Sequence, residues 1–97
     1  MTNYIGKKVI VRGRDSGVYF GELVDMQGMT VELKGCRNIW SWYGANNLLD
    51  IAEKGVDTAK SRISVKVDSI VFTDICEIVT LTDEAIKNLE GASEWKF

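Results

Sequence analysis

The sequence predicts an α+β fold: a small, curled, mainly antiparallel sheet of five or six strands, barrel-like in outline, with two short helices. Three observations lead to this prediction. Apolar and polar residues alternate in several short segments, most clearly where Met29, Val31 and Leu33 alternate with polar neighbours. Glycine, asparagine and aspartate separate these segments, and the chain has no proline. Residues 47–54 and 82–91 have the apolar spacing and the capping residues of helices.

The first third of the chain is expected to form two or three antiparallel strands. Residues 8–13 and 18–26 are rich in β-branched and aromatic residues, with a polar, glycine-containing turn between them. Gly21 removes a side chain in mid-strand, which predicts a bulge or a close approach by backbone or ligand. Gln27-Gly28 would then form a tight turn into a strand over residues 29–35.

Residues 37–47 join these strands to the first helix and contain two tryptophans, a tyrosine, an arginine and two asparagines. Alternate side chains of a strand share a face, so Trp40 and Trp42 are expected on one side, with Ile39 and Tyr43 on the other. Both faces are therefore largely apolar or aromatic. This pattern indicates a strand that is covered on both sides or one that lines a pocket.

The rest of the chain is expected to add two helices and further strands. Asn47 would cap the start of the first helix, and Gly55 stands where its left-handed C-cap is expected. Strands are predicted over residues 63–72 and 75–81 from their alternation and their β-branched residues. Thr82 would cap the closing helix, and Trp95 is expected to fold back onto the body.

Length and composition indicate one domain that covers residues 1–97. The net charge is −2, with +2 over residues 1–40 and −4 over residues 41–97, so a general nucleic-acid coat is disfavoured. The apolar runs are too short for a membrane span, and the first residues lack the apolar segment of a secretory signal. We therefore expect a protein of a reducing cytoplasm with Cys36 and Cys76 as free thiols, a disulfide between them being the less favoured alternative.

Catalysis is disfavoured by what the sequence lacks. The chain has no histidine, which excludes Ser-His and Cys-His dyads, and two cysteines alone do not form a zinc site. Phosphate-loop, dinucleotide-binding and nucleophile-elbow motifs are also missing. A carboxylate pair such as Asp83-Glu84 is more often a partner of the helix dipole than an acid–base pair. We therefore expect no enzymatic activity, no metal and no cofactor.

Binding is the better-supported class of function. Arginine forks suit phosphate groups, aromatic rings stack on a base, and amides read its edge. The candidate ligand-binding residues are three arginines, four aromatic residues and two asparagines: Arg12, Arg14, Arg37, Tyr19, Trp40, Trp42, Tyr43, Asn46 and Asn47. Two plainer interpretations stand beside this one. Two tryptophans in a strand more often pack in the hydrophobic core than stack on a ligand. The arginines of the first strand are also typical of a solvated sheet edge.

The segments Ser16-Gly-Val-Tyr-Phe-Gly21 and Arg37-Asn-Ile-Trp-Ser-Trp-Tyr-Gly-Ala45, with Leu48-Leu49 after them, resemble a family of small uncharacterised bacteriophage and prophage proteins. The likeness includes Glu77-Ile78 and the late Trp95. Members often have a second basic residue where Asn38 stands here, so a doubly basic site is not retained. The resemblance implies a phage accessory protein that acts in the host bacterial cytoplasm.

Two hypotheses follow for its function. The first is an anti-defence protein that binds and sequesters a small phosphorylated or cyclic nucleotide signal. The alternative is a protein-interaction module that inhibits a host defence protein by direct binding, through its acidic second half or an exposed aromatic patch. Single-stranded nucleic-acid binding is a weaker third possibility because the net charge is negative. A homo-oligomer is expected, since a nucleotide pocket is easier to build between subunits than inside so small a core.

Overall fold

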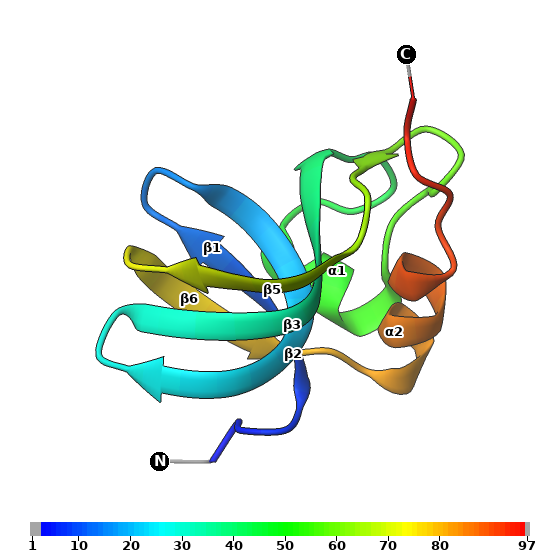
Figure 1. Cartoon of the computed structure of the whole chain (residues 1–97). Coiled ribbons are helices and arrows are strands. Elements are labelled where there is room, and N and C mark those ends of the chain that lie inside the picture. Colours follow the sequence, from blue (N-terminus) through cyan, green and yellow to red (C-terminus); the bar gives the residue numbers. More distant parts are fainter. Residues whose placement is uncertain (1–2, 97) are drawn as a thin grey trace.

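A computed structural model describes residues 3–96 and contains six strands and two helices (Figure 1). In chain order they are β1 (Lys8–Gly13), β2 (Gly17–Gln27), β3 (Thr30–Ser41), α1 (Leu48–Lys54), β4 (Arg62–Ile63), β5 (Val67–Phe72), β6 (Ile75–Thr80) and α2 (Asp83–Glu90). Met1, Thr2 and Phe97 lie outside the described residues. The predicted α+β class, with six strands and two short helices, is confirmed.

All strand pairs are antiparallel, and β5-β3-β2-β1-β6 is the order across the sheet, with the short β4 beside the far end of β3. β5 and β6 are at opposite edges, yet only Thr73 and Asp74 separate them in the chain. Two residues can span only a short distance, so the two edges of the sheet must lie close together at this point. This requires the sheet to curl. Figure 1 shows this curl. Because β5 and β6 do not pair, the sheet is curled and not a closed barrel.

Both faces of the sheet are apolar, and each has its own core. The concave face is filled by residues of β1, β2, β3, β5 and β6, namely Val9, Val11, Leu23, Val31, Leu33, Cys36, Phe72 and Ile75. On the opposite face, the strand residues Ile10, Val18 and Phe20 form a second core with Ile51 of α1 and Leu89 of α2. The helices therefore cover only one face of the sheet, and the curl itself encloses the other.

Two glycines explain how the strands reach this geometry. A Cβ atom on Gly21 would lie 2.8 Å from the carbonyl oxygen of Lys34, and the pairing of β2 with β3 shifts beside it. The predicted bulge and close backbone approach at Gly21 are thus confirmed. Gly35 has a φ of +57°, and the alternation of β3 shifts by one there, since Leu33 and Cys36 both face the concave core. The shift turns Arg37 toward the helices.

The N-caps of both helices agree with the sequence. The side chain of Asn47 accepts a hydrogen bond from the backbone N–H of Asp50 at 3.0 Å, and that of Thr82 accepts one from Ala85 at 3.1 Å. Gly55 ends α1 with a positive φ of +83°, but its ψ of −153° is not that of the left-handed C-cap that the sequence predicts. Neither helix has the length or the apolar surface that a membrane span requires.

Two predicted details were wrong. The tight turn is Gly28-Met29 instead of Gln27-Gly28, since Gln27 still pairs with Thr30, and Met29 is exposed in this turn. The strand expected from residue 63 is interrupted before β5. There the hydroxyl of Ser64 accepts a hydrogen bond from the backbone N–H of Asn38, so a side chain replaces one ladder bond, while the N–H of Ser64 still donates to the carbonyl of Asn38.

Both cysteines are free thiols, as predicted. Cys76 is exposed, whereas Cys36 is enclosed in the concave core. Burial raises the pKa of the Cys36 thiol to about 12, because a thiolate would be poorly solvated there. Cys36 is therefore an apolar filler of the core.

Asp74 fastens the two turns at one end of the curl. Its carboxylate accepts hydrogen bonds from the N–H groups of Asp15 (2.8 Å) and Ser16 (3.0 Å) and from the Ser16 hydroxyl (2.9 Å). The N–H of Arg14 donates to the Asp74 backbone carbonyl at 2.9 Å. Foremost the hydrogen bond from Asp15, and then those from Ser16, hold the pKa of Asp74 below its ordinary value of 3.8.

Protonation of Asp74 at acid pH is expected to weaken these hydrogen bonds and to destabilise the fold. A carboxyl group whose pKa is depressed by folding stabilises the fold above its unfolded pKa, and that contribution is lost as the pH falls through the folded-state pKa. The unfolding free energy of the wild type, measured in urea at pH 6 and at successive points below pH 3.8, should fall more steeply than that of Asp74→Asn. Parallel pH profiles for the two proteins would contradict the role assigned to Asp74.

Candidate functional site

Arg37 lies inside the protein. Its side chain is only 6% exposed. The guanidinium donates three hydrogen bonds to backbone carbonyls: Nε to Ser64 at 2.8 Å, and Nη1 to Leu89 at 3.2 Å and to Ala92 at 2.8 Å. Burial lowers the pKa of Arg37, and the charge of Glu94 opposes that shift. Arg37 thus joins β3 to the end of α2, and its donors point into the fold instead of toward a ligand.

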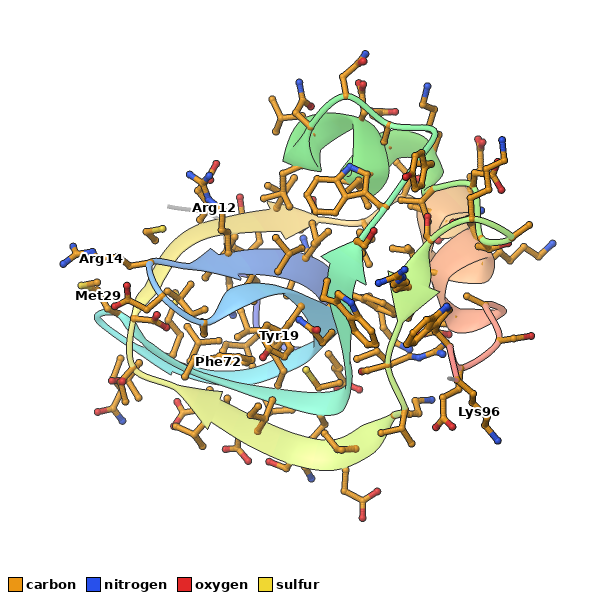
Figure 2. All side chains as sticks on the ribbon, turned by 90° about the horizontal axis from the view of Figure 1, so that it is seen from above. Arg12, Arg14, Tyr19, Met29, Phe72 and Lys96 are labelled. Atoms are coloured by element: carbon orange, nitrogen blue, oxygen red, sulfur yellow. The ribbon has the colours of Figure 1, made fainter. Side chains whose placement is uncertain are left out.

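Arg12 and Arg14 lie at the opposite end of the sheet from the C-terminal tail. Arg12 forms an ion pair with Glu77 across β1 and β6 at 2.5 Å, and Arg14 is exposed in the turn after β1. Figure 2 shows both arginines at one end of the molecule, with Lys96 at the other. Tyr19 packs on Phe72, with ring centroids 4.7 Å apart, on the concave side of the sheet.

The aromatic and amide candidates near the end of β3 have different surroundings. β3 ends at Ser41, so strand alternation does not extend to Trp42, which packs against the core under the helices. Trp40 remains in the strand and is 47% exposed. The predicted shared face of the two tryptophans was therefore wrong. Asn47 is the N-cap of α1, while Tyr43 and Asn46 are exposed.

A single copy of the chain therefore does not bring the predicted residues together. Arg37 and Trp42 support the interior, Arg12 and Arg14 are at the far end of the sheet, and Trp40 faces solvent elsewhere. The expectation that arginines and indoles surround one hollow was wrong for one copy. The physical reason is the shift at Gly35 together with the early end of β3, which send neighbouring side chains in different directions.

A different aromatic cluster forms where β3, β4 and the C-terminal tail meet. The backbone N–H of Trp95 donates a hydrogen bond to the carbonyl of Ile63 at 3.0 Å, so the tail lies beside β4. The Trp95 ring meets Trp40 edge-to-face, with centroids 5.2 Å apart and an interplanar angle of 86°. The guanidinium carbon of Arg62 lies 4.5 Å from the centroid of Trp95. We call Trp40, Arg62 and Trp95 the indole surface.

A hollow of about 360 Å³ adjoins the indole surface at Trp95. It lies between the loop after α1 and the C-terminal tail, and its lining is mainly small and polar: Thr58, Ala59, Ser61, Gly91, Ala92, Ser93, Glu94, Trp95 and Lys96. Its volume is within the range typical of small-molecule sites. The hydroxyl of Ser61 is already engaged, since it donates to Asp57 and accepts from the N–H of Tyr43.

The charges at this site are mixed and exposed. The ammonium of Lys96 lies 3.7 Å from the carboxylate of Glu94, a surface pair of the kind that contributes little to stability. Arg62 forms no ion pair with any other residue in the range 3–96. Within that same range, no group of three or more histidine, cysteine, aspartate or glutamate side chains is arranged to hold a metal ion.

Comparison with known protein families shows to which family the chain belongs. The model of a domain of unknown function, DUF6948, matches residues 6–89. The chain belongs to the DUF6948 family. Neither the curated proteins nor the solved structures contain a match to it.

The matched part of this DUF6948 domain includes Trp40 and Arg62 but ends before Trp95. Trp95 and Arg62 are also the site residues that sequence reasoning missed. The expectation that Trp95 folds back is confirmed, but a tail residue gives no sequence signal for the strand it meets. Arg62 stands at the end of a polar connecting segment, where a charged residue has no distinguishing pattern.

Proposed function

We propose that this protein is a non-enzymatic binding protein that captures a small phosphorylated nucleotide at the indole surface. The observation that carries the proposal is the half-exposed Trp40, held edge-on by Trp95 with the arginine Arg62 stacked beside them. An exposed indole next to a guanidinium offers a base a stacking partner and a phosphate a forked donor.

The indole surface is held in place by backbone contacts on both sides, which favours stacking. Ser41 pairs with Arg62 across β3 and β4, and the tail adds the bond from Trp95 to Ile63. A rigid aromatic platform loses little conformational entropy when a ligand binds. Arg62, which has no acidic partner among residues 3–96, retains its charge for a phosphate group.

The adjoining hollow supplies room for the remainder of such a ligand. Lys96, Thr58 and Ser93 line it, and their ammonium and hydroxyl groups match the hydroxyl groups of a ribose. Glu94 on the same wall would repel phosphate, so the phosphate is assigned to the Arg62 side of the indole surface.

The resemblance of residues 16–21 and 37–45 to phage proteins supports a biological setting for this binding. We propose a phage accessory protein in the bacterial cytoplasm that counters host defence by sequestering a cyclic or otherwise phosphorylated nucleotide signal. Sequestration needs affinity without turnover, and the chain has no histidine among its possible acid–base groups.

Calorimetric titration with a panel of cyclic mononucleotides, cyclic dinucleotides and nucleoside monophosphates tests the proposal. At least one member is expected to bind the wild type, with quenching of tryptophan fluorescence. Trp40→Ala should weaken that binding by about ten- to a hundredfold, because base stacking on an aromatic side chain contributes roughly 1–3 kcal/mol. Arg62→Gln should weaken it and reduce its salt dependence.

Tyr43→Ala is the matched control, since it removes an exposed aromatic residue that lies outside the indole surface. It should leave the affinity unchanged. If no member of the panel binds the folded wild-type protein, or if Trp40→Ala binds as tightly as the wild type, the nucleotide function is excluded.

Direct inhibition of a host defence protein is the second candidate function. The specific observation in its favour is the group of large apolar side chains that remain exposed, including Trp40, Leu49 and Val71. Pull-down from host lysate with Trp40→Ala and Leu49→Ala as comparison baits would separate the two functions. A specific partner retained by the wild type in the absence of nucleotide would favour inhibition.

A further inference from the structure

The outer edge of β5 has no strand partner. β5 pairs with β3 along one edge, and within residues 3–96 no strand pairs with the other edge. Along an unpaired edge, alternate N–H and C=O groups point away from the sheet and accept another strand. β5 is thus a place where a second extended chain can be added.

The usual protection of such an edge is slight here. Proteins block exposed edges with charged side chains, above all lysine, and with proline or a bulge. β5 contains one charged residue, Asp68, but no lysine or proline, and its pairing with β3 keeps one register throughout. Val67 and Val71 are exposed, Val71 at 58%. An exposed, β-branched edge of this kind is typical of a strand that pairs with a partner.

The sequence of β5 has a two-fold pattern that selects a second copy as that partner. Val67 and Val71 stand symmetrically about Ser69, and alternation puts all three on one face. In an antiparallel pair of β5 strands centred on Ser69, Val67 of each copy lies opposite Val71 of the other. A two-fold interface requires this self-complementarity, and the contact then occurs twice.

The charges near β5 support the same register. Pairing centred on Ser69 places the exposed Lys66 of one copy opposite Phe72 of the other, two residues from Asp74. Asp74 and Asp15 border a groove of about 460 Å³ that also contains Tyr19, Phe72 and Val71. Lys66 has no ion-pair partner among residues 3–96 of its own copy. Each copy therefore brings a cation to the acidic border of the other copy's groove.

We propose that two copies of this chain associate by antiparallel pairing of their β5 strands, centred on Ser69. The two curled sheets then continue into each other, and the exposed valines become cross-strand pairs. This interface is separate from the indole surface, so its test does not depend on nucleotide binding.

Disulfide trapping tests the register. Ser69→Cys in a Cys76→Ser background puts two cysteines directly opposite each other, within the Cα separation that a disulfide needs. Mild oxidation is expected to give a covalent dimer. Thr30→Cys in the same background is the matched control, because Thr30 is exposed at the start of β3, which pairs there with β2. It should cross-link far less.

Sedimentation of the full chain without nucleotide tests the association itself. The wild type should be a dimer, and Val71→Lys should raise its dissociation constant about tenfold or more, since two apolar pairs are lost and two charges are added. Leu49→Lys, a substitution at a similarly exposed site (62%) on α1, should remain a dimer, as should Trp40→Ala. A monomeric wild type at millimolar concentration, or equal cross-linking of the Ser69→Cys and Thr30→Cys proteins, would overturn the proposal.

Discussion

Replacing Arg37 by methionine is expected to lower the free energy of unfolding by about 3 kcal/mol, because hydrogen bonds from a charged donor contribute roughly 1.5–3 kcal/mol each and are not additive. The variant removes the donors of three backbone carbonyls, those of Ser64, Leu89 and Ala92, from the interior. Methionine fills the space of the aliphatic part but donates nothing. Lysine at this position should also destabilise, since one ammonium cannot reproduce the fork.

Arg12→Met is the matched control for this substitution. Arg12 is also an arginine on a strand, but it is exposed and has a single ion pair to Glu77. Its replacement should change the unfolding free energy by less than about 1 kcal/mol. Urea unfolding followed by tryptophan fluorescence compares the two. Equal effects would mean that the buried hydrogen bonds of Arg37 do not hold α2 to the sheet.

Gly55→Ala is the second substitution with a large expected effect. Gly55 has a φ of +83° and a ψ of −153°, a combination that costs other residues about 1–3 kcal/mol. An added Cβ would overlap the side-chain oxygen of Asn88. That amide accepts from the N–H of Val56 and donates to its carbonyl, both at 2.9 Å. Strain and displacement of Asn88 together should cost about 3 kcal/mol.

Gly28→Ala separates the two contributions. Gly28 also has a positive φ, +62°, but a Cβ there would meet nothing within 4 Å. Its replacement should cost about 1 kcal/mol, from backbone strain alone. Thermal unfolding of both variants gives the comparison. If Gly28→Ala is as destabilising as Gly55→Ala, contact with Asn88 is not the source of the larger effect.

The fold was predictable where a local signal decides the structure. The caps Asn47 and Thr82 bind the N–H groups that their positions in the sequence imply, and the short strands follow the β-branched residues. Gly21 was recognisable because a glycine in the middle of a strand typically marks a bulge or a close backbone approach. The curl of the sheet was less visible, since it depends on β1 pairing with the edge strand β6, more than sixty residues later in the chain.

The candidate site was less predictable because it depends on side-chain direction. Regular strand alternation through residue 43 predicts one set of side-chain directions, but the shift at Gly35 and the end of β3 at Ser41 change the direction of the side chains that follow. An arginine suited to phosphate has the same sequence signature as one that binds carbonyls, so Arg37 was assigned to a ligand. Only tertiary structure brings Trp95 to Trp40 across the chain.

The order of the strands has a consequence for synthesis on the ribosome. β1, β2 and β3 emerge as a meander with two apolar faces before β6, α2 and the carbonyls of Leu89 and Ala92 that bind Arg37 are made. The nascent meander therefore stays partly uncovered until α2 has been translated. Contacts between distant segments form slowly, so a chain truncated before α2 is expected to be aggregation-prone.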